Sequence, residues 1–126
     1  MTTNYRQMSN IADALKEKTL KDISISGKVS NVMPLEREYA APNIISFYLQ
    51  DNTGVILAHI PQGNNSSEEY KRLELNLRSA EQTKEEIHIT EKIGRGIPVP
   101  FWTPAEQINA DSITFPSNTL TYQPYK

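Results

Sequence analysis

The fold of this chain is predicted by residues 23–62, ISISGKVSNVMPLEREYAAPNIISFYLQDNTGVILAHIPQ. Apolar and polar residues alternate from Ile25 to Ser30 and again from Ser46 to Asp51. A period of two is typical of strands with one buried face and one solvated face. The turn at residues 52–54 separates the second run from a third, Val55–Ile60, and Gly54 is expected to supply the positive φ that reverses the chain. The stretch therefore predicts a meander of three strands.

Five strands and two helices are expected along the whole chain. The strands are about Ile23–Met33, Ile44–Gln50, Val55–Ile60, Glu86–Ile93 and Asp111–Phe115. A short helix is expected from Ser9 or Asn10, since either residue can cap it. The run Ser66–Glu69, a hydroxyl residue followed by acids, predicts the start of a longer helix. Residues 34–43 and the proline-rich residues 94–104 are expected to form exposed loops.

The alternation assigns a side of the sheet to each residue of the three central strands. Eight residues are expected to face the core, namely Ile25, Gly27, Val29, Phe47, Leu49, Ile56, Ala58 and Ile60. Eight others are expected to face outward, namely Ser26, Lys28, Ser30, Ser46, Tyr48, Gln50, Leu57 and His59. In the longer helix the apolar residues at 70, 73, 77 and 80 recur at helical spacing, which predicts one buried stripe.

The length and composition suit one soluble domain, because 126 residues with 37% hydrophobic side chains can enclose a core. We expect a flexible N-terminus at residues 1–8, a single domain at 9–115 and a tail at 116–126 without core residues. The chain has no cysteine, which excludes disulfides and thiol catalysis. It also has no apolar run long enough for a membrane span, so a cytoplasmic location and no membrane partner are expected.

A longer pattern, Gly-x-Val followed by Phe-x-Leu-x-Asp-x-Thr-Gly-x-Ile, resembles the OB-fold nucleic-acid-binding family. Within that family it is similar to the replication protein A and tRNA-anticodon-binding branches. The residues that carry the resemblance are Gly27, Val29, Phe47, Leu49, Asp51, Thr53, Gly54 and Ile56. The likeness is strong over the three-strand stretch and weak from there to about Phe115. It implies an all-β fold with one or two helices, a five-stranded Greek-key barrel with a helix between strands three and four and a short N-terminal helix.

The resemblance implies a binding surface on strands two and three, flanked by the loops between strands one and two and between strands four and five. The candidate nucleic-acid-binding residues are Lys28, Arg37, Tyr39, Tyr48, Gln50, His59, Lys92, Arg95, Phe101 and Trp102. Tyr48 is expected to stack on a base while the cations follow the phosphates. Two alternatives stay open: Tyr48 can pack on Leu57, and the aromatic pair at 101–102 can fill the barrel mouth. Asp51 and Thr53 are expected to tie the turn together and not to touch a ligand.

The expected function is non-catalytic binding of single-stranded nucleic acid, with DNA favoured over RNA. A net charge of −2 and a pI near 5.7 argue against binding by bulk electrostatics alone, so stacking and a modest basic track must contribute. The alternative is a protein-interaction OB-fold, a subunit of a larger replication, repair, secretion or mobile-element complex, whose partner is another protein or a second copy. OB-folds serve either role.

Signals for enzymatic chemistry are weak. His59 and His88 lie on different expected strands without the spacing of a metal site, and the glycine-rich residues 94–96 lack the lysine of a P-loop. No nucleophile motif surrounds the serines. We therefore expect no enzymatic activity, no cofactor and no metal.

Overall fold

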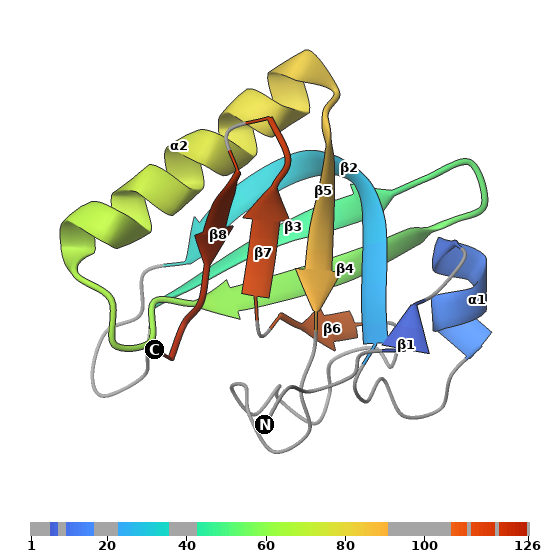
Figure 1. Ribbon diagram of the computed structural model, residues 1–126, viewed down its shortest axis with the longest axis horizontal. Helices are drawn as coiled ribbons and strands as arrows, with labels where there is room; N and C mark the ends of the chain where they lie inside the picture. Colours follow the sequence, from blue (N-terminus) through green and yellow to red (C-terminus); the bar gives the residue numbers. More distant parts are fainter. Residues whose placement is uncertain are drawn as a thin grey trace.

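The computed structural model describes residues 6–7, 10–16, 23–35, 43–90, 107–110, 112–117 and 119–125. These residues form one eight-stranded sheet and two helices (Figure 1). The strands are β1 (Arg6–Gln7), β2 (Ile23–Leu35), β3 (Ile44–Gln50), β4 (Val55–Pro61), β5 (Glu86–Thr90), β6 (Gln107–Asn109), β7 (Ser112–Phe115) and β8 (Leu120–Tyr122). The helices are α1 (Ile11–Lys16) and α2 (Ser67–Thr83).

The sheet is predominantly antiparallel. Its six antiparallel strands follow the order β4-β3-β2-β5-β7-β8. The two shortest additions are parallel, β1 to β2 and β6 to β4. The pairings between described residues do not close the sheet into a barrel. The mostly β class expected from the sequence is therefore confirmed, while the closed five-stranded barrel stays a prediction.

The core lies between the sheet and the two helices. All eight residues expected to face inward on β2, β3 and β4 are buried. Leu73, Leu77 and Ala80 of α2 join the same apolar cluster, as do Ile11 and Ala14 of α1. In Figure 1 α1 lies near the β3–β4 turn, whereas α2 begins near the other end of this hairpin.

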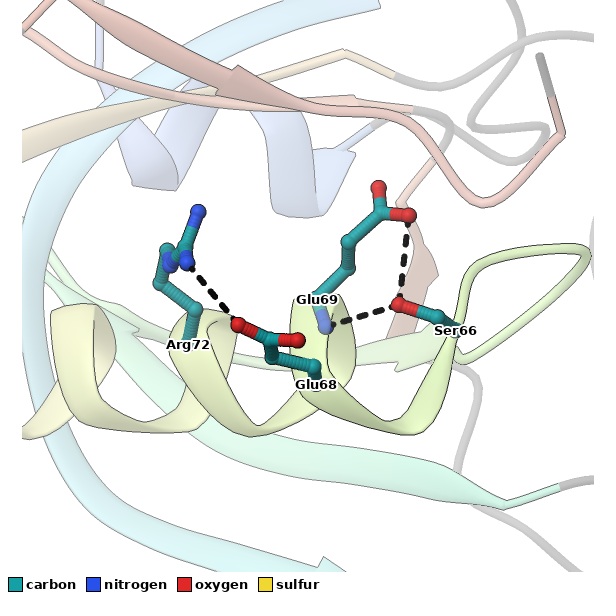
Figure 2. A network of polar contacts seen from close by, with 4 residues as sticks. All are labelled: Ser66, Glu68, Glu69 and Arg72. Atoms are coloured by element: carbon teal, nitrogen blue, oxygen red, sulfur yellow. Dashed lines mark hydrogen bonds and ion pairs between the residues drawn. The ribbon is translucent and has the colours of Figure 1, made fainter.

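Helix α2 begins with the hydroxyl cap that its sequence predicts (Figure 2). The Ser66 hydroxyl oxygen accepts a hydrogen bond from the Glu69 N–H at 3.1 Å and donates one to Glu69 Oε1 at 3.3 Å. Glu68 lies in the same first turn and forms an exposed ion pair with Arg72 at 3.5 Å. Two acids at the positive end of the helix dipole further favour this start point.

Strand β2 changes its side-chain alternation partway along. Its register against β3 shifts between Ser30 and Met33, and Asn31 in this interval has a φ of 53°. An extra residue in one strand is a β-bulge, which moves later side chains to the opposite face. Accordingly Val32 is buried, while Met33 is 38% exposed. Met33 thus faces outward, whereas strict alternation from Val29 would place it in the core.

The β3–β4 turn is held by a carboxylate. Asp51 Oδ1 accepts hydrogen bonds from the Thr53 N–H at 2.7 Å, the Thr53 hydroxyl at 2.6 Å and the Gly54 N–H at 3.1 Å. Gly63 is the one glycine with a positive φ among the described residues, so the positive φ expected at Gly54 is wrong. The expectation that Asp51 and Thr53 tie the turn together is confirmed.

The C-terminal residues pack onto the connection between β4 and α2. Strand β8 pairs with β7, and Tyr122 is buried with its hydroxyl donating to the Gln62 carbonyl at 3.0 Å. The Asn65 side chain donates to the Gln123 carbonyl at 2.8 Å. Residues 119–125 are therefore not the coreless tail that their sequence suggests, because their partners lie about sixty positions earlier in the chain.

Candidate nucleic-acid interface

Nine side chains of β2, β3 and β4 share the outward side of the sheet, and we call them the outer face. Directly paired residues of neighbouring strands point to the same side. The register gives three rows across the strands, Met33–Ser46–His59, Ser30–Tyr48–Leu57 and Lys28–Gln50–Val55. Tyr48 therefore occupies the centre of the outer face.

Tyr48 is half-buried, and its neighbours Ser30 and Leu57 are half-buried as well. Phe47, the preceding residue, points the other way and is fully buried. A tyrosine on this side of the strand can present part of its ring to a ligand without leaving the core incomplete. Such a ring is a suitable platform for a nucleic-acid base, because every base has a π face.

The charge of the outer face comes from Lys28, which is exposed. Its ladder partners are Gln50 on β3 and Glu86 on β5. None of the nine residues is acidic, although the whole chain has 15 acidic against 13 basic residues. An anionic ligand placed over Tyr48 would therefore meet a cation and no carboxylate within the outer face.

Ser46 and His59 form one end of the outer face. Ser46 was expected to be exposed, but its side chain is only 3% exposed and its hydroxyl is hydrogen-bonded to His59 Nδ1 at 2.7 Å. His88 on β5 makes a similar contact with Ser26 at 2.6 Å. Among the described residues, no group of three or more His, Asp or Glu side chains could hold a metal ion.

The structure brings together the four predicted site residues that it describes, since Lys28, Tyr48, Gln50 and His59 all belong to the outer face. The other six predicted site residues lie outside the described residues, namely Arg37, Tyr39, Lys92, Arg95, Phe101 and Trp102.

Two members of the outer face were missed by sequence reasoning. Val55 is 44% exposed and is paired with Gln50. Extending the alternation of β4 by one residue would have predicted that Val55 faces outward. Met33 was missed because the bulge reverses the alternation. Asn31 was the available signal, because asparagine tolerates the left-handed conformation better than most residues.

A surface groove of about 620 Å³ adjoins the outer face at Lys28. It is lined by Lys28, Val29, Ser30, Gln50, Asp51, Asn52, Glu81, Lys84 and Glu86. Partial burial acts to raise the pKa of Asp51, but hydrogen bonds from Thr53, Ile11 and Gly54 outweigh it and lower the pKa below its ordinary value. Asp51 is therefore ionised at neutral pH and contributes a negative charge to the groove.

Within the described residues, no helix has both the length and the apolar character needed to cross a membrane. No family model and no curated protein matches this chain.

Proposed function

We propose that this chain binds single-stranded nucleic acid, without catalysis, across the outer face. The observation that carries the proposal is the half-buried Tyr48 at the centre of a three-strand surface that has Lys28 and no carboxylate. Stacking of one base on an aromatic side chain contributes about 1–3 kcal/mol. Because Lys28 is the only cation of the outer face, stacking supplies most of the affinity. DNA is the first ligand to test.

The proposal includes an OB-type Greek-key barrel. Strands β4, β3, β2 and β5 form a continuous series, with β6 paired to β4 at one end and β7 paired to β5 at the other. Only Ala110 and Asp111 separate β6 from β7. A single bent fifth strand composed of β6 and β7 would join both ends of the series. In the numbering of such a barrel β4 is strand three and β5 is strand four, so α2 lies between strands three and four. In such barrels the face of strands two and three, here β3 and β4, is a common binding surface.

Fluorescence anisotropy with a labelled oligothymidine tests the proposal. We expect binding that weakens between about 50 and 200 mM salt, since each phosphate contact releases counterions. Tyr48→Ala should weaken binding about 5- to 150-fold, the equivalent of the stacking energy, with little change in melting temperature. Tyr48→Phe is the matched control and should retain affinity, because it keeps the ring. Equal affinity of Tyr48→Ala and wild type would place the site elsewhere.

A protein-interaction role is the second candidate. Of the four large hydrophobic side chains that are exposed among the described residues, two belong to the outer face, Met33 and Val55. They occupy opposite corners, with Tyr48 and Leu57 between them. Exposed apolar side chains gathered on one face suit a protein partner or a second copy of the chain. Absence of oligonucleotide binding at low salt, together with a concentration-dependent dimer in sedimentation that Val55→Ser abolishes, would favour this role over the first.

A further inference from the structure

The groove beside the outer face has the opposite charge character. It shares Lys28, Ser30 and Gln50 with the outer face and extends to the C-terminal end of α2. Its remaining charged residues are Asp51, Glu81, Lys84 and Glu86, so three carboxylates stand against two ammonium groups. A ligand phosphate that passes Lys28 on this side enters a site with a net negative charge.

Hydrogen bonds hold two of these carboxylates in place. Asp51 is fixed by its turn, and Glu81 Oε2 accepts a hydrogen bond from the Asn31 N–H at 3.2 Å. Glu86 is exposed and is the direct ladder partner of Lys28 across β2 and β5. The cation of the outer face is therefore adjacent to an acid on its groove side.

The length of the outer face along β3 sets how many stacked nucleotides it can hold. Its three rows span four residue steps of β3, which is about 14 Å at roughly 3.4 Å per residue. Stacked nucleotides also advance by about 3.4 Å each, so this length accommodates about four of them. A phosphate that moves past Lys28 toward β5 comes closer to Glu86, well within the Debye length of about 10 Å, where repulsion is incompletely screened.

We propose that Glu86, together with the groove carboxylates, forms an anionic boundary that ends the footprint of a bound single strand at Lys28. Glu86 is thereby a specificity-determining residue that limits the footprint of the bound strand at this edge of the outer face. This inference rests on the proposed function.

Two labelled oligonucleotides test the boundary. One contains four thymidines, and the other contains the same four thymidines flanked on each side by abasic nucleotides that add phosphates but no bases. In the wild type the flanks should change affinity less than about twofold, because the added phosphates gain no cation. Glu86→Lys should tighten the flanked oligonucleotide about five- to tenfold more than the unflanked one at about 50 mM salt. It should also steepen the salt dependence by about 0.7, the value for one further phosphate contact.

Glu68→Lys is the matched control. Glu68 carries the same charge change but lies in the first turn of α2, about 20 Å along the helix from Glu81 at 1.5 Å per residue. It should leave the difference between the two oligonucleotides unchanged. The boundary is wrong if Glu86→Lys tightens both oligonucleotides equally, or if both lysine variants act alike. If neither the wild type nor any variant binds either oligonucleotide, the boundary and the proposed function both fail. Both also fail if only Glu86→Lys binds, because the wild type then has no footprint to limit.

Discussion

Replacing Asp51 by alanine should destabilise the protein by about 2–4 kcal/mol, because this carboxylate supports two separate backbone segments. Its Oδ1 holds the β3–β4 turn, while its Oδ2 accepts a hydrogen bond from the Ile11 N–H at 2.9 Å, forty positions earlier in the chain. Thr53 Oγ1 accepts from the Ala12 N–H at 3.0 Å, and Asn10 Oδ1 accepts from the Asp13 N–H at 2.8 Å. The backbone N–H groups of the first turn of α1 have no acceptor within the helix, and most of them thus donate to side chains of the distant β3–β4 hairpin.

The magnitude follows from these contacts. Helix α1 has six residues, too few to persist in isolation. Loss of a helix cap costs about 0.5–2 kcal/mol, and hydrogen bonds to a charged acceptor contribute about 1.5–3 kcal/mol. Because both sets of bonds converge on one carboxylate, their losses are not additive, and the combined cost stays near the stated range. Asn52→Ala, in the same turn but with an exposed side chain, should cost less than about 0.5 kcal/mol.

The effect of Asp51→Ala should depend on pH. Desolvation raises the pKa of Asp51, but hydrogen bonds from Thr53, Ile11 and Gly54 outweigh it, so the folded pKa lies below the unfolded value. The stabilisation is therefore complete well above the unfolded pKa of about 4 and is lost as the pH falls through the folded pKa. Urea denaturation should show that Asp51→Ala lowers the free energy of unfolding strongly at pH 7. Near pH 3 the variant and the wild type should differ less in this free energy. A cost at pH 7 no larger than that of Asn52→Ala would refute the capping argument.

Three further substitutions test the packing, each by urea denaturation. Gly63→Ala should cost more than about 2 kcal/mol, because the residue has a φ of 63° and a Cβ there would collide with the Pro124 carbonyl; a cost below about 1 kcal/mol would show that the C-terminal segment shifts freely. Ser46→Asp should cost about 2 kcal/mol or more because it places a charge at a buried position, and tolerance of it would mean that Ser46 is exposed in solution. Tyr122→Phe should cost about 1 kcal/mol through loss of the hydrogen bond to Gln62, and an unchanged midpoint would argue against that bond.

The local sequence was sufficient for β2, β3, β4, β5 and β7, though not for the short strands β1, β6 and β8, and for most of the outer face. Burial with a period of two is a local property of an extended chain, so the alternation around Phe47 and Tyr48 assigned their sides correctly. The start of α2 was also predictable, because Ser66 and Glu69 cap the helix within four residues of each other. Features like these depend on contacts between residues close together in the sequence.

Other features were decided only by the tertiary structure, because they join residues that are far apart in the chain. The alternation of β2 did not reveal that Glu86 would lie beside Lys28, since that neighbour comes from β5. The composition of the C-terminal segment did not reveal that Tyr122 would be buried against the end of β4. Asp51 was expected to tie its own turn, but its role in capping α1 required the approach of a segment forty residues away. Burial and charge at these positions follow from which segments meet in space, and that is a property of the whole fold.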